Sequence, residues 1–413
     1  MSLLLEECGR MVIMSNGKKG FTLLELLVVI GILSVLATVA ILVINPVEQL
    51  KQARDARRIV DIQTLNLSLS SAQNTNMAMG AANTIYVSIP DTSPTCANSG
   101  LPTPPTGWTY ACATSANYLK VDGTGWIPVN IAGTGVSSMG TLPVDPTNSG
   151  ATGLYYIYVS GGSYALSATL ESDKYFKQNG MKDGGSDPSK FEQGSNLALL
   201  AQANGLVGYW PLDENGGSVA IDASGNGDNG TWSGTGTHYV PGKVGISAGQ
   251  FDGVDDYINV PNNAAITFST GDFSIAFWTI QYNQHQASWP RIMGKGSWQG
   301  DGWEIYIDRT VNYATFYSYQ AGAAQGVDIG TISNTVPMHV AIVKSGTTVS
   351  TYLNGVLQRM GTIINPMASA QAFSMGVSPA GSVQYSRGML DDVRLYDRAL
   401  SPVEIRNMYI ASK

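Results

Sequence analysis

Glu25 is the residue whose chemistry most needs an explanation. It is the one charged residue in the segment 21–44, where every other residue is apolar, small or a hydroxyl. As a helix this segment would be about 36 Å long at 1.5 Å per residue, enough for the roughly 30 Å hydrocarbon core of a membrane. A carboxylate in such a segment is costly, so we expect Glu25 to serve a purpose that offsets the cost.

A second group of residues is suited to binding a cation. Asp222, Asn226 and Asp228 lie in a Gly-rich stretch, and carboxylate and amide oxygens are the ligands that Ca²⁺ prefers. The same residue types also build ordinary turns, in which the side chain hydrogen-bonds to nearby backbone. The sequence leaves both interpretations open.

Three tryptophans indicate a third kind of chemistry. Trp289, Trp298 and Trp303 occur close together, with Arg291 and Lys295 among them. Aromatic side chains line many ligand sites, and their faces stack on sugar rings. We predict that Trp289 and Trp298 contact a ligand, whereas Trp303 packs in the core.

A carboxylate pair for glycoside hydrolysis is not expected. Glu304 and Asp308 are four residues apart in "WEIYID", which on one face of a strand separates them by roughly 13 Å. Both hydrolytic geometries need a shorter distance. The sequence therefore predicts a protein without catalytic residues, and an enzyme acting on glycans is the less favoured alternative.

The composition limits the class of protein. Only 13% of the residues are charged, about half of the usual ~25%, and Gly is abundant, which is typical of a β-rich extracytoplasmic protein. The net charge of −7 argues against nucleic-acid binding, because phosphate contacts need a basic surface. His238, His285 and His339 are too far apart in the sequence to form a local metal site.

Periodicity divides the chain into parts. Helical spacing predicts one long helix over 21–70, apolar all round at first and amphipathic in its second half. Alternation over 71–180 predicts β-strands, and "LYYIYV" and "YALSATLE" are expected to form a hairpin. Polar residues at 181–204 predict a linker, and regularly spaced short strands over 205–413 predict a two-sheet sandwich.

The N-terminal sequence "KKGFTLLELLVVIGIL" resembles the prepilin signature of type IV pilins and type II secretion pseudopilins. The resemblance implies a leader peptide over 1–20, which a prepilin peptidase removes by cutting between Gly20 and Phe21, and N-methylation of Phe21. It also implies that Glu25 pairs with the N-terminal ammonium of a neighbouring subunit. Such pairing would offset the cost of the buried charge and help to set the register of assembly.

The same resemblance covers about 14–200 and implies an α+β pilin-like module, in which the long N-terminal helix, transmembrane over 21–44, packs on a small antiparallel sheet. It implies a single-pass protein of the cytoplasmic (inner) membrane before assembly. The N-terminus lies in the cytoplasm and the later domains outside, at the cell surface or on a filament. Met1, Met11 and Met14 remain open as the start of the chain.

The cysteines agree with an oxidising compartment. Cys8 precedes the expected cut, so Cys96 and Cys112 remain as an even pair in the mature chain. We predict a disulfide between them; two unpaired thiols are the alternative.

The C-terminal part contains, in order, "LVGYWPLDENGG", "DASGNGDNG", "GQFDGVDDYINV", "FSIAFWTI", "YLNGVLQ" and "GMLDDVRLYDRALSPVEI". This series resembles laminin G-like, concanavalin A-type jelly rolls. It implies an all-β jelly-roll sandwich over 205–413 with adjacent first and last strands. It also implies a structural Ca²⁺ to which Asp391 could add a ligand. Asn354-Gly355 predicts a tight hairpin.

Together these features predict a minor or tip subunit of a type IV pilus or type II secretion-like filament. The subunit would display a lectin-like domain for adhesion to a glycan or another cell-surface ligand. A membrane-anchored carbohydrate-binding protein that does not assemble is the alternative. The sequence does not distinguish between filament systems and does not identify the ligand.

Overall fold

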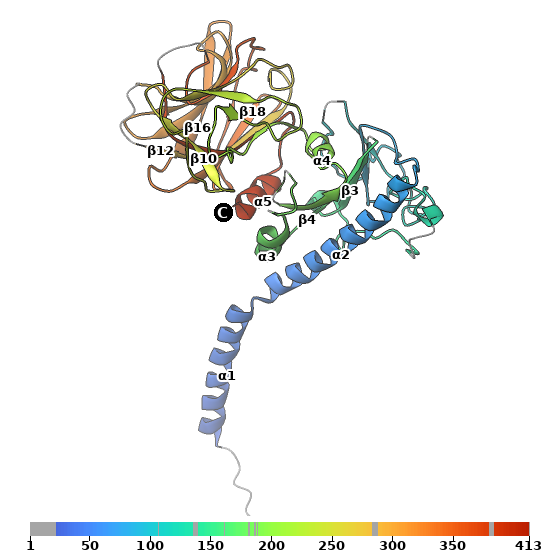
Figure 1. Cartoon of the computed structure of the whole chain (residues 1–413). Helices are drawn as coiled ribbons and strands as arrows, with labels where there is room; N and C mark the ends of the chain where they lie inside the picture. The colour runs from blue at the N-terminus through green and yellow to red at the C-terminus, as the bar shows by residue number, and fades with distance from the viewer. Residues whose placement is uncertain are drawn as a thin grey trace, which may run out of the picture. The chain divides into compact units, whose positions relative to one another are not determined.

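The computed structural model describes residues 22–412, except 106, 135–138, 161, 181, 186, 188, 283–287 and 380–383. The chain divides into two compact units, 1–50 and 51–413, and Figure 1 colours it from blue at the N-terminus to red at the C-terminus. The predicted leader 1–20 and the predicted cleavage site at Gly20 and Phe21 lie outside the described residues.

The first unit contains helix α1 (Leu23–Ile44), and Glu25 has a local role at its start. The backbone N–H and the hydroxyl of Thr22 both donate to Oε2 of Glu25 over 2.9 Å, and the N–H of Glu25 donates to Oγ1 of Thr22 over 3.2 Å. This reciprocal arrangement is a capping box. Among the residues that the structure describes, no helix combines the length and the apolarity needed to cross a membrane, which differs from the transmembrane segment predicted over 21–44.

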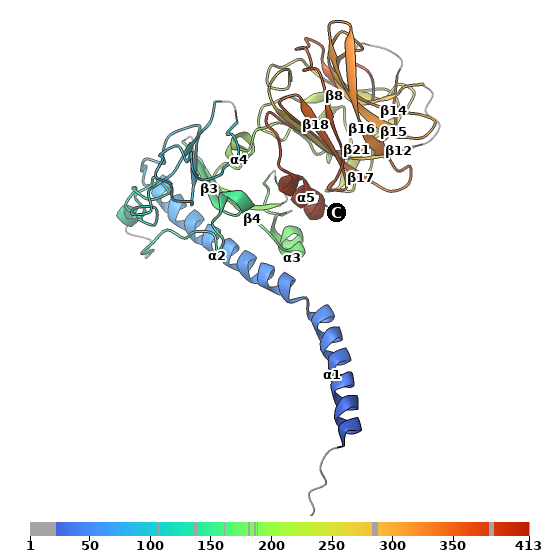
Figure 2. The same ribbon diagram turned by 180° about the vertical axis from the view of Figure 1, so that it is seen from behind.

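Most of helix α2 (Pro46–Asn74) belongs to the second unit, where it covers one face of a small sheet (Figures 1 and 2). Its buried apolar residues recur every three or four positions, which is the spacing of one helix face. They are Ile59, Ile62, Leu65, Leu69 and Ala72. They share a core with Tyr156, Tyr158, Tyr164 and Leu166 of the sheet.

The sheet has five strands in the order β2-β1-β3-β4-β5. Their bounds are β1 (Thr84–Val87), β2 (Thr109–Ala111), β3 (Tyr156–Ser160), β4 (Tyr164–Thr169) and β5 (Lys190–Gly194). Strands β3 and β4 form the predicted hairpin, with Tyr158 opposite Leu166. All pairings are antiparallel except β1 with β2.

The prediction of a linker at 181–204 is wrong. This segment contains β5, which pairs with β4 so that Phe191 lies opposite Ala168, and helix α4 (Ala198–Ala203). Before it lie the single turn α3 (Asp173–Tyr175) and a π-helical turn, η3 (Phe176–Gly180). The polar composition is typical of loops, but pairing with β4 satisfies the backbone groups of β5 and its Phe191 is buried in the core.

Arg58 joins helix α2 to the end of β4 and to a distant loop. Its side chain is fully buried and donates to Oδ2 of Asp145 over 2.6 Å, to Oδ1 of Asp55 over 2.8 Å and to Glu171 over 2.5 Å. Burial opposes the charge, but these carboxylates more than offset it, so the pKa of Arg58 lies above its ordinary value. The carboxylate of Asp55 also accepts from the N–H groups of Glu171 and Ser172.

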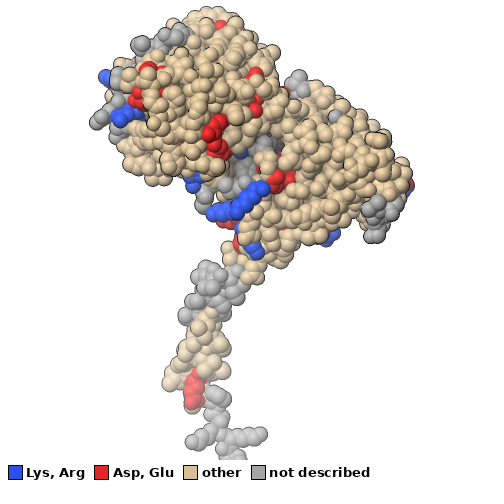
Figure 3. All heavy atoms as spheres, in the orientation of Figure 1, with Lys and Arg blue, Asp and Glu red and all other residues tan. Residues whose placement is uncertain are grey.

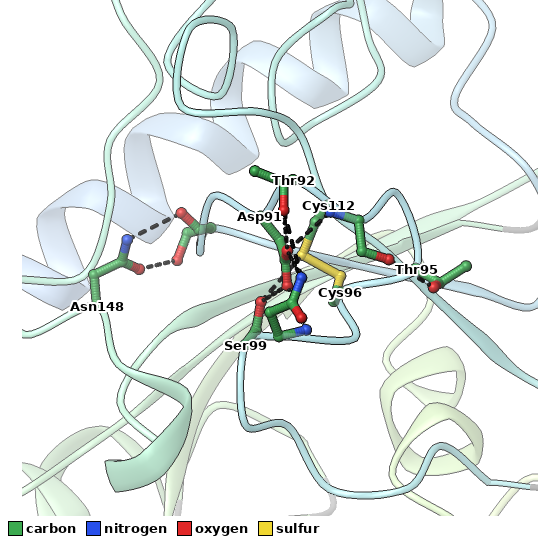
Figure 4. The surroundings of a disulfide bond; sticks show 10 residues. Asp91, Thr92, Thr95, Cys96, Ser99, Cys112 and Asn148 are labelled. Carbon is green, nitrogen blue, oxygen red and sulfur yellow. Dashed lines mark hydrogen bonds between the residues drawn. A yellow bond between two sulfur atoms is a disulfide. The ribbon is translucent and has the colours of Figure 1, made fainter.

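The predicted disulfide between Cys96 and Cys112 is present, with 5.3 Å between the two Cα atoms (Figure 4). It closes the loop 96–112, and Asn98 and Ser99 of this loop donate hydrogen bonds to the carboxylate of Asp91, as does Ser93. These bonds, led by the one from the Ser99 hydroxyl, hold the pKa of Asp91 well below its usual range.

The C-terminal part is a sandwich of two eight-stranded sheets. The first has the order β19-β18-β17-β12-β21-β10-β9, and β6 also pairs with β21. Its strands are β6 (Leu206–Trp210), β9 (Tyr239–Pro241), β10 (Ser247–Asp252), β12 (Phe273–Gln281), β17 (Met338–Ser345), β18 (Thr348–Leu353), β19 (Val356–Thr362) and β21 (Arg387–Tyr396).

The second sheet has the order β16-β15-β14-β13-β20-β11-β8-β7. Its strands are β7 (Val219–Ala220), β8 (Gly230–Ser233), β11 (Tyr257–Val260), β13 (Arg291–Ser297), β14 (Asp301–Asp308), β15 (Tyr313–Gln320), β16 (Ala323–Thr331) and β20 (Phe373–Met375). Helix α5 (Pro402–Ala411) ends the described chain.

Alternating side chains of the two sheets fill the space between them. Phe273 of β12 stacks on Phe268, and Trp303 of β14 packs against Phe316 and Phe373. As the sequence predicted, the first and last strands are neighbours, because β6 pairs with β21. The predicted hairpin at Asn354-Gly355 joins β18 to β19, and both residues have positive φ, 51° and 75°, which this tight turn requires.

Replacing Arg58 tests the buried ion-pair network. We expect Arg58→Met to lower the free energy of unfolding by about 3–5 kcal/mol, because it leaves buried carboxylates without their cation. The matched control is Arg57→Met, which removes a neighbouring exposed arginine with a 3.6 Å contact to Asp61 and should cost less than about 1 kcal/mol. Urea denaturation measures the free energy of unfolding of both variants. An equal loss of stability in the two variants would contradict the stabilising role given to the Arg58 network.

Candidate ligand-binding pocket

Strands β14 and β15 present tyrosines on the face of their sheet that points away from the core. On β14, Trp303 and Ile305 point into the core, so the alternation of a strand places Glu304 and Tyr306 on the opposite face. On β15, Phe316 is in the core and Tyr317 and Tyr319 lie on that same opposite face. The rings of Tyr306 and Tyr317 stack 4.7 Å apart.

Trp289 and Trp298 stand beside these tyrosines and are about half exposed, at 47% and 50%. Trp289 meets Tyr306 edge-on at 5.4 Å, and Trp298 meets Tyr319 edge-on at 5.3 Å. A pocket of about 640 Å³ lies between them, lined by Trp289, Arg291, Ser297, Trp298, Tyr306, Ser378 and Gln384. The structure thus brings both predicted ligand-binding tryptophans to one pocket, while Trp303 is fully buried in the core.

Local turns hold the two tryptophans at the rim. Trp298 lies in the turn between β13 and β14, which the N–H of Gly300 closes by donating to the carbonyl of Ser297 over 2.9 Å. Trp289 lies just before β13, and its carbonyl accepts a 2.6 Å hydrogen bond from Nη1 of Arg291. A tethered backbone fixes where each indole ring can lie.

The carboxylate of Glu304 accepts hydrogen bonds from three side chains beneath the pocket. This role was not predicted from the sequence. Glu304 is fully buried and accepts from Nε of Arg291 over 3.0 Å, from the Tyr319 hydroxyl over 3.1 Å and from the Ser378 hydroxyl over 2.7 Å. A buried carboxylate needs such partners. The sequence signal for this role is a lone Glu at an outward position between apolar residues of one strand.

Glu304 and Asp308 do not come together as a pair. The carboxylate of Asp308 accepts from the hydroxyl and the N–H of Thr310 at the end of β14, and these two bonds lower its pKa. Glu304 is committed to Arg291, Tyr319 and Ser378. Each carboxylate therefore serves its own local hydrogen bonds.

The residues predicted to bind Ca²⁺ make hydrogen bonds within the protein. Both carboxylate oxygens of Asp222 accept from the loop itself and from Tyr209, including the N–H groups of Ser224 and Asp228. The Asn226 amide donates to the carbonyl of Val207. These hydrogen bonds agree with the turn interpretation, and the calcium interpretation stays a prediction.

The remaining predicted ligands are engaged elsewhere. Asp228 accepts from the Asn263 amide over 2.6 Å, and the cation that attracts it is the ammonium of Lys295. Asp391 is buried and accepts from the N–H groups of Lys243 and Val244; burial raises its pKa to about 8.

Among the described residues, three carboxylates approach within 4.8 Å of one another only at Asp252, Asp255 and Asp256. In this turn Asp252 accepts from the N–H groups that follow it, and Asp256 lies 3.3 Å from the imidazole of His238. This group was not among the predicted ligands, because its spacing is also that of an ordinary turn.

Two sequence families match this chain. Residues 15–41 match the prokaryotic N-terminal methylation motif, and residues 252–406 match the concanavalin A-like lectin/glucanases superfamily. The N-terminal segment therefore carries the pilin-type methylation motif, and the sandwich carries the lectin-like domain. The search of curated proteins found no match to this chain.

Several solved structures resemble about half of this chain at low identity. The binding domain of Paraclostridial Mosquitocidal Protein 1 is 18% identical with a TM-score of 0.42, covering 50% of this chain and 52% of that one. The botulinum neurotoxin serotype G binding domain is 14% identical with a TM-score of 0.40, covering 49% and 50%. The chain spans about half the length of these structures.

A smaller structure is covered almost completely. Domain 4 of AbnA, a GH43 extracellular arabinanase from Geobacillus stearothermophilus, in complex with arabinotriose, is 22% identical with a TM-score of 0.38. The match covers 49% of this chain and 97% of that one.

Lys295 provides a pH test of the buried polar groups at this end of the sandwich. Its ammonium donates to Oδ1 of Asn262 and to the carbonyl of Gln371, each over 2.6 Å, yet burial lowers its pKa to about 8. Between pH 8 and about 10.4, the ordinary lysine value, the unfolded chain binds more protons than the folded chain. Stability attributable to Lys295 should therefore rise with pH across this window.

The comparison with Lys295→Met isolates this contribution, because other titrating groups are common to both proteins. We expect the melting temperature of the native protein to rise relative to that of the variant between pH 8 and 10. Parallel curves for the two proteins would refute the assignment.

Proposed function

We propose that this protein is a minor or tip subunit of a type IV pilus-like or type II secretion-like filament, and that its sandwich binds carbohydrate. The observation that carries the proposal is the presence, on one chain, of a methylation motif at 15–41 and of a pocket flanked by two half-exposed tryptophans. The motif supports processing and assembly, and the pocket supports ligand binding.

Assembly is supported by the surface of α1. Its described apolar side chains are exposed, with Leu23 at 82% and Leu24 at 71%, and such a surface favours association with other apolar surfaces. We propose that a prepilin peptidase cuts after Gly20 and that the N-terminal segment holds the precursor at the cytoplasmic membrane, with the N-terminus inside. Helices of neighbouring subunits then cover α1, and Glu25 pairs with a neighbour's N-terminal ammonium.

Carbohydrate binding is supported by the chemistry of the pocket. Sugar rings have apolar faces that stack on aromatic rings and hydroxyl groups that need hydrogen-bonding partners. Trp289 and Trp298 offer the first, and Ser297, Ser378 and Gln384 offer the second. The proposed contacts require no metal ion and no catalytic carboxylate.

A minor or tip position is supported by size. The sandwich accounts for about half of the chain, and the same domain on every subunit would crowd the surface of a filament.

Few charges interrupt the surface seen in Figure 3, and the negative net charge is unfavourable for nucleic acid as a partner.

Assembly is tested by separating the charge of Glu25 from its capping role. Glu25→Gln keeps a side chain that completes a capping box but cannot pair with an ammonium, so we expect filament incorporation to fall about tenfold or more. The matched control Thr22→Ala removes the cap and keeps the charge, and it should assemble. Immunoblots of sheared filaments measure incorporation, and normal incorporation of Glu25→Gln would contradict the pairing.

The ligand site is tested with the full chain on a glycan array. We expect Trp289→Ala and Trp298→Ala each to weaken binding about tenfold, because each removes a stacking face worth about 1–3 kcal/mol by analogy with base stacking. Val356→Ala, an exposed change on β19 of the other sheet, should bind as the native protein does. Binding that both tryptophan variants retain in full would place the ligand elsewhere.

A further inference from the structure

We infer that the pocket takes an uncharged oligosaccharide and that Gln384 recognises the hydroxyl groups of this ligand. The inference rests on the carbohydrate-binding function proposed above and concerns the same pocket. It follows from the balance of charge beneath the two tryptophans and from the side-chain amide of Gln384, which makes no hydrogen bond within the described part of the chain.

The charge in the pocket is already balanced. Arg291 is the one charged residue among the described residues that line it, and it is only 4% exposed. Its Nε lies 3.0 Å from the buried carboxylate of Glu304. The face of its guanidinium lies 5.0 Å from the ring of Tyr306. Arg291 is thus covered by a ring on one side and neutralised by a carboxylate on the other.

An acidic sugar would lose more than it gains in such a pocket. A carboxylate or sulfate that leaves water needs an uncompensated cation or several N–H donors, and the cation here is engaged by Glu304. The chain as a whole carries a net charge of −7, which repels anions. An uncharged sugar ring has no charge to desolvate and is not repelled by the net charge, and it can still stack on Trp289 and Trp298.

Gln384 is a lining residue whose side-chain amide has unused donors and an unused acceptor. Its carbonyl accepts from the N–H of Arg291 over 3.1 Å, which fixes its backbone at the edge of β13. The hydroxyls of Ser297 and Ser378 donate to Asp301 and Glu304. The side-chain amide of Gln384 makes no hydrogen bond within the described part of the chain.

An amide fits a hydroxyl group better than it fits an anion. The amide of Gln384 offers donors on its nitrogen and an acceptor oxygen, and a sugar hydroxyl both donates and accepts. A carboxylate or sulfate only accepts, so half of this capacity would remain unmet. We therefore assign Gln384 as a specificity-determining residue of the pocket. Arg291 positions Trp289 by donating a hydrogen bond to the carbonyl of Trp289.

The test uses the full chain and matched polysaccharides: arabinan, galactan, mannan, xylan and a mixed-linkage glucan, each beside its sulfated derivative. We expect at least one neutral member to bind about tenfold more tightly than its sulfated form, with an affinity that changes little between low and high salt. Trp298→Ala and Gln384→Ala should weaken that binding. Gln384→Lys, which adds an uncompensated cation, should shift the preference toward the sulfated form.

Each outcome decides between the two proposals. Preferential binding of a sulfated form, lost in Trp298→Ala and weakened by salt, overturns the uncharged class but leaves the carbohydrate site standing. Neutral binding that neither Trp298→Ala nor Gln384→Lys alters overturns the assignment to this pocket. Absence of binding to every polysaccharide overturns the proposed carbohydrate function itself. Val356→Ala and the melting temperature of each variant control for folding.

Discussion

Strand β14 has to serve two faces of one sheet, and the pocket depends on this constraint. Trp303 and Ile305 point into the core. Because side chains alternate along a strand, Glu304 and Tyr306 lie on the opposite face of the sheet. A shift of one residue would move the carboxylate into the core and the tryptophan out of it. The packing of Trp303 against Phe316 and Phe373 therefore fixes the position of the Glu304 carboxylate beneath the pocket.

Buried charge follows the same rule in both parts of the second unit. Arg58 ties helix α2 to Asp145 and Glu171, and Arg291 ties the start of β13 to Glu304. In each case a buried arginine joins segments that are distant in the sequence and is neutralised by carboxylates, as burial requires. The consequence differs between the two sites. The ion pairs of Arg58 hold helix α2 on the sheet, whereas the ion pair of Arg291 with Glu304 leaves no uncompensated charge among the described residues that line the pocket.

Features with a local pattern were predictable from the sequence, and features made by long-range pairing were not. The β3–β4 hairpin, the cysteine pair, the core position of Trp303 and the adjacency of Trp289 and Trp298 follow from alternation, spacing or family resemblance. Strand β5 was missed because its residues are polar and its pairing with β4 is not visible locally. The hydrogen-bonding roles of Arg58 and Glu304 were missed for a related reason, since their partners lie on other strands and loops. The predicted calcium ligands stay a prediction, because turn residues and ligand residues are of the same types.

The capping box at the start of α1 sharpens the question of why a charge stands in an apolar segment. Glu25 hydrogen-bonds to Thr22 within its own chain, and this contact alone would justify a polar side chain at that position. A glutamine, however, would complete the same box without a charge. The cap therefore does not explain the carboxylate. What the charge adds beyond the cap is attraction for a cation. Among the described residues, Glu25 hydrogen-bonds with Thr22, whose side chain carries no charge. This is why the pairing proposed for Glu25 looks to a second subunit.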